Sequence, residues 1–346
     1  MKAVVFHKHG GPEVLSYEEL ADPEPSSRQV LVQVRGVALN HLDLFVRKGW
    51  PGLSLKMPHV LGSDIAGTIS ELGSEVPAGL TVGTQVVVDP NVYCGRCEFC
   101  LRGQHSLCDE YRIIGEHENG GYAELFAVDS GSVIPVPAEA GLSMTDAAAV
   151  PLTFMTAWRL LMTKAQVRAG DDVLIIGIGG GVALAALQIA KMVGARVFVT
   201  SSSDDKLKRA ERLGADVGIN HSRTPDYHKE IWRMTSKRGV DVVVDSVGQA
   251  TWERSLRSLR KGGRLVTPGA TSGPNVPTNI SLIFWRQLEV LGSTMGSSSE
   301  LRDVLKLVWA KRLRSVVDRV MPLSQAKAAH EILERGEQFG KIVLTP

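Results

Sequence analysis

The residues from 171 to 200 constrain the fold of this chain more than any other stretch. They read DDVLIIGIGGGVALAALQIAKMVGARVFVT. Residues 172–176 are a short apolar, β-branched run that predicts a buried strand, and a cluster of glycines follows it. From Val182 good helix formers continue without proline until Gly194, and residues 196–200 are again β-branched. The pattern predicts a strand, a glycine turn, a helix and a second strand, which favours an α/β fold with a parallel sheet.

The glycine cluster is predicted to bind a pyrophosphate. It consists of Gly177, Gly179, Gly180 and Gly181. Without side chains, backbone N–H groups can approach an anion, and the start of the helix adds partial positive charge. The spacing fits a G-x-x-G-x-x-A variant rather than G-x-G-x-x-G, because Val182 occupies the sixth position counted from Gly177. We therefore expect a dinucleotide site here, with a ligand-free glycine turn as the alternative.

The end of the second strand bears on which dinucleotide binds. An NAD site usually has an acidic residue about 20 residues after the glycine turn, whereas this strand ends in a run of serines that includes Ser201 and Ser202. Small hydroxyls with Lys206 close behind suit a 2′-phosphate, so we expect NADP(H), with NAD(H) possible. Alternatively, Lys206 is a solvated helix residue. Asp204 and Asp205 are expected to cap the next helix and to favour its first turn.

Length and charge restrict the class of protein. With 346 residues the chain is long enough for two domains. Its 39 basic and 37 acidic residues give a net charge of +2, and no basic run is interleaved with aromatics, so neither nucleic acid nor an anionic membrane is expected as a partner. No apolar stretch reaches the roughly 18 residues of a membrane span, and MKAVVFHKHG lacks a signal-peptide core. We expect a cytoplasmic protein.

All four cysteines lie in the segment VYCGRCEFCLRGQHSLC, at Cys94, Cys97, Cys100 and Cys108. Four thiolates with this C-x2-C-x2-C-x7-C spacing can surround one tetrahedral zinc ion. Because all four ligands would be sulfur, no position stays open for water, and the predicted zinc is structural. A bare thiol loop or redox pair is the alternative.

The distribution of elements suggests two domains. Residues 1–83 alternate short strands with proline and glycine turns, which is an all-β pattern. A helical texture begins near residue 142 and is divided by Pro151. Beyond the glycine turn, strands alternate with helices as in a doubly wound parallel sheet, and KIVLTP ends the sequence as a strand.

Together these segments resemble the medium-chain dehydrogenase/reductase superfamily, which includes zinc alcohol dehydrogenases and quinone oxidoreductases. The resemblance covers the whole chain and rests on GVALNHLD, PHVLGSDIAG, the four-cysteine lobe, GGYAE, VPLTFMTAW, the glycine turn, DVVVDSVG, GGRLVTPGATSG and FGKIVLTP. It implies a GroES-like β domain, residues 1–152 and 295–346, around a Rossmann nucleotide-binding domain, residues 153–294. Exposed sheet edges near residues 290–294, together with the resemblance, suggest a homodimer or homotetramer.

The resemblance also shows that this chain lacks the usual ligands of a catalytic zinc ion. Zinc-dependent members place a Cys, a His and a second Cys at positions that here read Ala38, Ser63 and Leu152. Alanine and leucine have no donor atom and a serine hydroxyl is a poor one, so the usual catalytic zinc site cannot form. A rebuilt metal site is the alternative, and its candidate ligands are His41, Asp43, His59, Asp64 and His117.

Without this zinc, reduction of a conjugated acceptor is the easier reaction. In an enone or quinone the incoming negative charge spreads to an oxygen that hydrogen bonds can stabilise. By the resemblance Asn40 lies at the position of the proton-relay hydroxyl of alcohol dehydrogenases, so it is the first candidate donor, with His41 and Asp43 as weaker proton sources. Asn40 and Asp43 fixing a turn is the alternative.

Strand ends of a doubly wound sheet face the ligand and should line the nicotinamide. The cofactor-binding residues expected there are Thr156, Ser246, Val247, Gly269, Ala270 and Ser293. The sequence thus favours an NAD(P)H-dependent reductase of quinones or α,β-unsaturated carbonyls acting on a small apolar substrate. A zinc alcohol dehydrogenase with a rebuilt site, or a non-enzymatic NADPH-binding sensor or structural protein, remains open.

Overall fold

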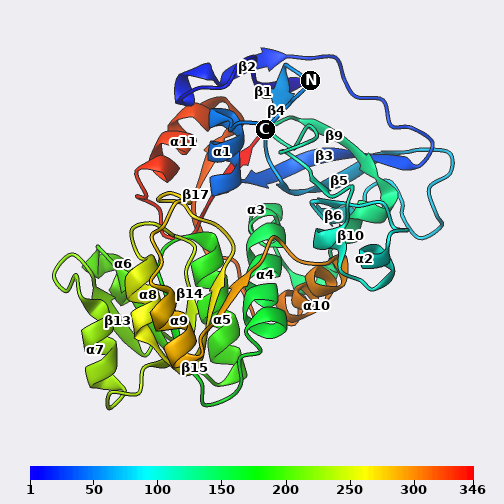
Figure 1. Ribbon diagram of the computed structural model, residues 1–346. Helices are drawn as coiled ribbons and strands as arrows, with labels where there is room; N and C mark the ends of the chain where they lie inside the picture. Colours follow the sequence, from blue (N-terminus) through cyan, green and yellow to red (C-terminus); the bar gives the residue numbers. More distant parts are fainter. The chain divides into compact units, whose positions relative to one another are not determined.

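The computed structural model describes residues 1–346, which divide into two compact units (Figure 1). Unit 1 contains residues 1–152 and 297–346, and unit 2 contains residues 153–296. The α/β fold class with a GroES-like unit and a parallel-sheet unit is confirmed. No helix has both the length and the apolar character required to cross a bilayer.

Unit 1 is rich in strands and draws on both ends of the sequence. Its strands are β1 (Lys2–Phe6), β2 (Ser16–Glu19), β3 (Gln29–Ala38), β4 (His59–Val60), β5 (Asp64–Leu72), β6 (Gln85–Val88), β7 (Asn91–Val92), β8 (Arg112–Ile113), β9 (Leu125–Asp129), β10 (Val133–Pro135), β17 (Val317–Pro322) and β18 (Lys341–Thr345). Its helices are α1 (His41–Lys48), α2 (Glu98–Leu101), α3 (Met144–Ala148), α10 (Ser298–Trp309) and α11 (Ala326–Glu334). Helix α4 (Pro151–Trp158) starts at the end of unit 1 and enters unit 2.

The main sheet of unit 1 has seven strands in the order β10-β6-β5-β3-β18-β17, with β9 also paired to β3. β18 runs antiparallel to β3, so Val343 lies opposite Ala38. On the other side of β3, Ala38 lies opposite Asp64 at the start of β5. Alternating apolar residues of these strands form the buried core. This register brings the ends of β3, β5 and β18 together.

Unit 2 is a parallel sheet with helices around it (Figure 1). Its strands are β11 (Asp172–Ile175), β12 (Arg196–Ser201), β13 (Val217–Asn220), β14 (Val240–Val244), β15 (Leu259–Thr267) and β16 (Glu289–Gly292). Its helices, after a π-helical continuation of α4 over Arg159–Lys164, are α5 (Gly181–Val193), α6 (Asp204–Arg212), α7 (Tyr227–Met234), α8 (Trp252–Ser258) and α9 (Ile280–Arg286). The strand order is β13-β12-β11-β14-β15-β16. The order reverses beside β11, which is the point where doubly wound sheets bind ligands.

Candidate active site

The glycine turn follows β11 and leads into α5 as expected. Gly177 has φ of +73° and Gly179 has φ of +132°, which glycine adopts at no steric cost. Gly180 is the N-cap of α5, no side chain caps the helix, and a Cβ placed on Gly180 would meet nothing within 4 Å. No side-chain cap covers the first N–H groups of α5, from Gly181 and Val182 onward, and the space beside Gly180 is open. The turn fits a pyrophosphate.

The other expected nicotinamide residues of unit 2 follow strands on the same edge of the sheet. Ser246 and Val247 come after β14, Gly269 and Ala270 after β15, and Ser293 after β16. The three loops are linked, because Ser272 N–H donates to Val247 O at 2.8 Å and Ser293 N–H to Thr267 O at 3.0 Å. Asp245 orders the first loop by accepting from the N–H groups of Val247 and Gly248.

Two hydroxyls in unit 2 are buried without a partner. They are Oγ1 of Thr156 and Oγ of Ser293. Burying a hydroxyl without a hydrogen bond costs about 1–3 kcal/mol, so an orphaned hydroxyl calls for a missing partner. A nicotinamide carboxamide has the donor and acceptor atoms to fill that role.

At the far side of β11, Ser201 ends β12 and lies beside Asn220 at the end of β13. Ser203, rather than Asp204, caps α6 by accepting from the N–H of Lys206 at 3.3 Å. Asp204 lies in the first turn of α6, where it accepts from Asn220 Nδ2 at 2.8 Å and pairs with Arg223.

The sequence reasoning missed Asn220 and Arg223 as cofactor candidates. Asn220 Nδ2 also donates to the backbone oxygen of Ser202 at 3.2 Å. The detectable signal was topological, because neighbouring parallel strands place their carboxyl ends side by side.

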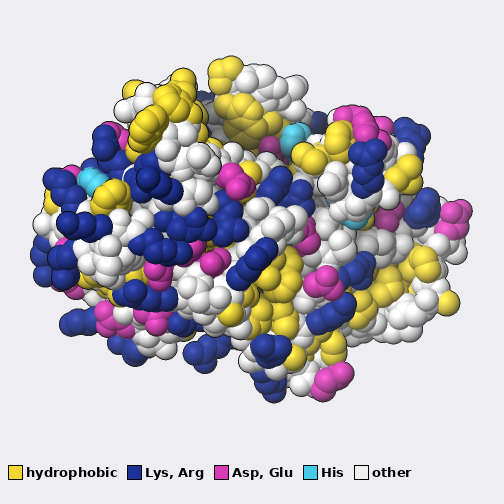
Figure 2. Space-filling model, turned by 60° about the horizontal axis from the view of Figure 1, so that its bottom comes forward, with side chains coloured by type: hydrophobic (Ala, Val, Ile, Leu, Met, Phe, Trp, Pro, Cys, Tyr) yellow, Lys and Arg dark blue, Asp and Glu magenta, His cyan; other side chains and the backbone are white.

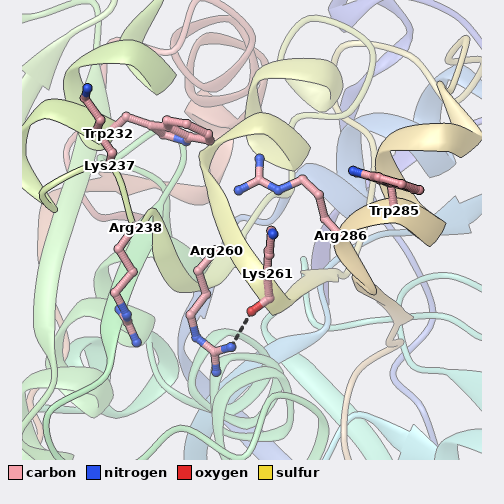
Figure 3. Close-up of a pocket in the computed structure, with 7 residues that line it drawn as sticks. All are labelled: Trp232, Lys237, Arg238, Arg260, Lys261, Trp285 and Arg286. Carbon is pink, nitrogen blue, oxygen red and sulfur yellow. Dashed lines mark hydrogen bonds between the residues drawn. The ribbon is translucent and has the colours of Figure 1, made fainter.

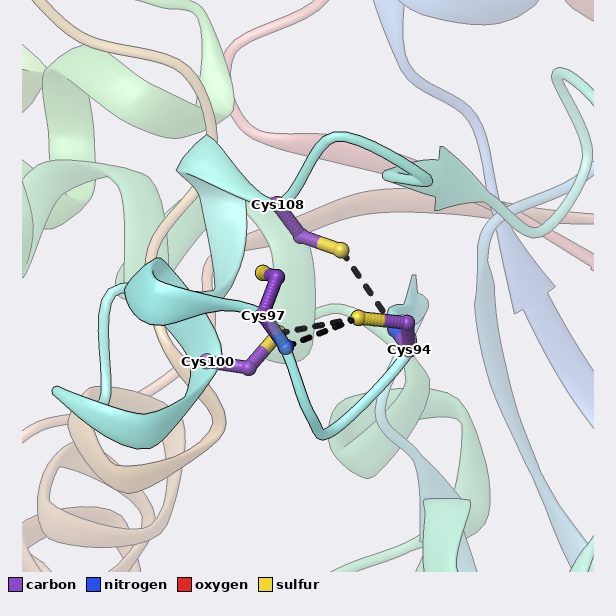
Figure 4. Close-up of side chains that lie close together, drawn as sticks. All are labelled: Cys94, Cys97, Cys100 and Cys108. Carbon is purple, nitrogen blue, oxygen red and sulfur yellow. Dashed lines mark hydrogen bonds between the residues drawn. The ribbon is translucent and has the colours of Figure 1, made fainter.

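The four cysteines converge in unit 1 (Figure 4). Their Sγ atoms all lie within 4.8 Å of one another, which suits a tetrahedral ion with Zn–S bonds of about 2.3 Å. Backbone N–H groups of Arg96 and Cys97 donate to Cys94 Sγ and lower the pKa of that thiol to about 6. Burial raises the pKa of Cys100 to about 12. A divalent cation would hold all four groups as thiolates.

A buried polar cluster lies where β3, β5 and β18 meet. Lys341 Nζ donates to Asp64 Oδ2 at 2.8 Å and to Asn40 Oδ1 at 2.5 Å. Asn40 Nδ2 donates to Asp64 Oδ2 at 2.9 Å and, at 3.3 Å, to Ala38 O. The amide of Asn40 is thus oriented by a buried ion pair, and its side chain is 7% exposed.

Asn40 and Asp43 also organise the start of α1. The backbone N–H of Asn40 donates to Asp43 Oδ2 at 2.7 Å, and that of Gly62 donates to Oδ1 at 3.0 Å. Burial raises the pKa of Asp43 to about 7, although these N–H groups and Lys341 favour the carboxylate. Burial, with Lys341 and Lys48 nearby, lowers the pKa of His41 to about 4. At neutral pH His41 is therefore uncharged.

Buried polar groups continue from Asp43 into the core of unit 1. The Tyr122 hydroxyl lies 3.2 Å from His330 Nε2, and burial together with the nearby Asp43 carboxyl raises the pKa of Tyr122 well above its usual value. Arg47 donates to His330 Nδ1 at 2.9 Å, which leaves the ring proton on Nε2. Burial and Arg47 lower the pKa of His330 to about 3, so this histidine is neutral.

The three positions without zinc ligands surround Asp64. Ala38 is its partner across the sheet, Ser63 precedes it, and the N–H of Leu152 donates to Asp64 Oδ1 at 2.7 Å. The structure thus brings Ala38, Ser63 and Leu152 to one place, and the Ser63 hydroxyl is the only atom of their three side chains that could bind a metal. That hydroxyl is buried without a partner. A catalytic zinc does not fit this set of side chains.

The five candidates for a rebuilt site do not replace the lost ligands. His41, Asp43, His59, Asp64 and His117 form no group of three potential ligands, and the cysteine cluster is the one such group in the chain. His59 Nε2 lies 3.3 Å from Gly115 O, and His117 Nδ1 accepts from Ile113 N–H at 3.3 Å. Both imidazoles therefore hydrogen-bond to nearby backbone groups.

A β unit drawn from both ends of the sequence, a dinucleotide-type α/β unit and a four-thiol cluster define a dehydrogenase of the zinc-binding type. Comparisons with known proteins agree. The Zinc-binding dehydrogenase family matches residues 181–310, and the Alcohol dehydrogenase GroES-like domain matches residues 26–138. The chain belongs to the medium-chain dehydrogenase/reductase superfamily, which includes the zinc-type alcohol dehydrogenases, and it is an oxidoreductase of that superfamily.

Individual relatives cover the whole chain. A zinc-type alcohol dehydrogenase-like protein of Schizosaccharomyces pombe is 33% identical over 99% of both chains. An acryloyl-coenzyme A reductase of Metallosphaera sedula is 30% identical over 100% of both. Among solved structures, an NAD-dependent alcohol dehydrogenase is 45% identical with a TM-score of 0.96, again over 100% of both chains.

Proposed function

We propose that this protein is an NAD(P)H-dependent reductase of α,β-unsaturated carbonyl compounds or quinones that works without a catalytic zinc. One observation carries the proposal: Ala38, Ser63 and Leu152 gather around Asp64 and supply no zinc-binding set. Apart from the Ser63 hydroxyl, the polar side chains at this place, those of Asn40, Asp64 and Lys341, hydrogen-bond to one another. The reaction must therefore suit a site with hydrogen bonds and no Lewis acid.

A conjugated acceptor meets that requirement. NAD(P)H supplies a hydride from C4 of its nicotinamide when bound. The acceptor is reduced by the hydride and then takes one proton, and its oxygen carries the charge in between. That oxygen needs an N–H or O–H donor, whereas oxidation of a simple alcohol needs a group that stabilises an alkoxide. An acryloyl thioester is such an acceptor, and full-length relatives include acryloyl-coenzyme A reductases.

Asn40, His41 and Asp43 are the proposed site residues for that oxygen and proton. Asn40 Nδ2 is the donor to the oxygen, for which it gives up its longer bond to Ala38 O. His41 is uncharged at neutral pH and offers a ring N–H. Asp43, with its pKa near 7, can exchange a proton at physiological pH.

NADPH is the proposed preferred cofactor. No carboxylate ends β12, Ser202 is exposed, Lys206 lies in the first turn of α6, and Arg223 lies in the turn after β13. In this arrangement Arg223 would exchange Asp204 for a 2′-phosphate. One structural zinc at the cysteine cluster is proposed as the only metal, and the clustered thiols support a cytoplasmic location.

Metal content and acceptor range test the proposal together. We expect one zinc per chain by elemental analysis, and turnover of a quinone, an enone or acryloyl-coenzyme A with NADPH. Simple aldehydes and alcohols should be turned over far more slowly. Two zinc ions per chain, one of which survives Cys100→Ser and is needed for alcohol oxidation, would instead establish a rebuilt catalytic metal site.

Substitution of Asn40 tests its proposed role. Asn40→Ala should lower kcat about 10²-fold, the usual effect of removing one oxyanion donor, without changing the Kd for NADPH. Asn40→Ser, which restores a hydroxyl donor, should recover part of kcat. If both variants turn over like the wild type, Asn40 only shapes the turn.

Cofactor preference is measured separately. Lys206→Ala and Arg223→Ala should each raise KM for NADPH and leave KM for NADH unchanged. Lys208→Ala, an exposed neighbour on α6, is the matched control. A wild-type enzyme with equal kcat/KM for both cofactors would contradict the NADPH assignment.

A further inference from the structure

A basic cavity in unit 2 has no place in the proposed reaction (Figure 3). Its volume is about 480 Å³, within the usual range for small-molecule sites. It is lined by Trp232, Lys237, Arg238, Arg260, Lys261, Trp285 and Arg286. Figure 2 shows Lys and Arg side chains crowded over the part of unit 2 that carries α6 to α9. The lining contains five cations and no acid.

The cavity lies at the edge of the sheet opposite the glycine turn. Lys237 and Arg238 lie in the turn before β14, separated from it by Gly239, and Arg260 and Lys261 lie at the start of β15. The turn at Gly177 and the loops after β14 and β15 all follow the carboxyl ends of these parallel strands. The cavity is therefore separate from the dinucleotide site, and its contents do not depend on the proposed function.

Three of the five cations lack a carboxylate partner. Arg238 and Arg260 both bind Asp241, at 2.6 Å and 2.5 Å. Lys237, Lys261 and Arg286 form no ion pair. Arg286 donates to Leu259 O and lies over the Trp232 ring, 4.9 Å from its centroid. Burial and the charge of Arg257 lower the pKa of Arg286. This surplus of positive charge favours an anion.

The backbone around the cavity is unusual for its sequence. Ser236 and Lys237 have φ of +52° and +65°, a conformation that side chains other than glycine rarely adopt. β15 also bulges, because Val240 pairs with Leu259 but Val242 pairs with Arg264. The turn carries Lys237 and the bulge carries Lys261, and both residues line the cavity. Strained turns and bulges are concentrated at functional sites.

The aromatic side chains add a second kind of contact. In Figure 3 Arg286 lies between the rings of Trp232 and Trp285, with Lys261 beneath it. Trp285 is 77% exposed, which leaves its ring open to stack on a planar group. Trp285 lies at the end of helix α9, beside Arg286. A site with unpaired cations and an open indole suits a phosphorylated aromatic compound.

We propose that this basic cavity binds a nucleoside polyphosphate, with its phosphates on Lys237, Lys261 and Arg286 and its base on Trp285. The site takes a ligand of three or more negative charges because that many cations lack partners. No covalent step is involved.

Binding of ATP to enzyme already saturated with its dinucleotide tests this site. Calorimetry should show one ATP per chain, with inorganic tripolyphosphate binding more weakly. Lys237→Ala/Lys261→Ala should weaken ATP binding about tenfold or more. Lys8→Ala/Lys327→Ala removes the same charge from exposed positions of unit 1 and should have no effect. In Trp285→Ala, ATP should bind only as tightly as tripolyphosphate does, because the base loses its stacking partner.

Several results would overturn the proposal. Competition of ATP with the dinucleotide, so that the saturated enzyme binds no ATP, would place ATP in the dinucleotide site. Equal weakening of ATP binding by both double variants would mean general charge attraction. ATP and tripolyphosphate binding equally to the wild type would remove the nucleoside from the ligand class. None of these results bears on whether the protein reduces an enone or a quinone.

Discussion

Lys341 and Asp64 form an ion pair whose side chains are 4% and 0% exposed. Such a pair gains little net stability over apolar side chains, but removal of one partner leaves a buried charge. Both carboxylate oxygens of Asp64 also accept other hydrogen bonds, Oδ1 from the N–H of Leu152 and Oδ2 from Nδ2 of Asn40. The pair therefore serves to orient Asn40 at the proposed site.

Removal of one charge should be costly and removal of both much less so. Lys341→Met should lower the free energy of unfolding by about 3–5 kcal/mol, measured by denaturant titration. Lys341→Met/Asp64→Asn should recover most of that loss, because the amide oxygen still accepts from Leu152. Lys2→Met, which breaks the exposed pair with Glu19, is the control and should cost at most about 1 kcal/mol. Additive single and double effects would exclude the coupling.

Asp43 should make stability depend on pH. Its pKa is raised from 3.8 to about 7 in the folded state, so the folded protein binds the proton more tightly than the unfolded chain. The stability from this proton is complete below pH 4 and is lost as pH rises to about 7. Unfolding of the wild type and Asp43→Asn should be compared over this range.

The comparison isolates Asp43 from neighbouring groups. His41 and His330 have lowered pKa values and act in the opposite direction, because their stability is lost as pH falls below 6.5. These effects are common to both proteins and cancel in the difference. The variant should gain stability relative to the wild type as pH rises from 4 to 7. A constant difference would mean that Asp43 keeps its ordinary pKa.

At the scale of elements, local patterns predicted unit 2 well and short helices poorly. The strand, glycine turn, helix and strand from residue 172 to 201 were predicted because burial on both faces gives continuous apolar runs. Helix α1 was missed because it has only eight residues, although Asn40 and Asp43 have the spacing of an N-terminal cap. α9 and α11 were also not predicted.

Long-range partners explain what the sequence did not reveal about the site. The cysteine cluster is local, so its spacing alone predicted it. Lys341 binds Asp64, which is 277 positions away, and no local pattern marks a lysine in an apolar strand as buried and paired. Arg223 likewise meets Asp204 only because β12 and β13 are neighbours.

The cysteine lobe should depend on its metal. Cys100→Ser should remove the zinc measured per chain and lower Tm, since a structural zinc contributes folding energy. Leu101→Ser changes the next residue, which is 76% exposed, and should leave both zinc and Tm unchanged. Full zinc content in Cys100→Ser would contradict a four-thiolate site.

At the scale of the whole molecule, β16 leaves one edge of the unit 2 sheet unpaired within the chain. Val290 on this strand is 38% exposed. An open apolar edge favours pairing with a second copy across a twofold axis. We propose that β16 joins two protomers.

A charge on that edge should separate the protomers. Val290→Lys should shift the sedimentation coefficient of the protein from a dimer, or a dimer of dimers, towards smaller species. Val82→Lys places the same charge at a 61% exposed valine of unit 1 and should have no effect. An unchanged oligomer in Val290→Lys would mean that assembly uses another surface.

The position of β18 has a consequence for how the protein is made. This strand lies between β3 and β17 inside the main sheet, and its Lys341 reaches Asn40, 301 positions earlier. During synthesis unit 2 can fold as soon as it leaves the ribosome. At that stage β3 still lacks its neighbouring strand β18, which is synthesised last. In nascent chains stalled before residue 341, unit 2 should therefore resist protease, whereas residues 1–152 should be cleaved.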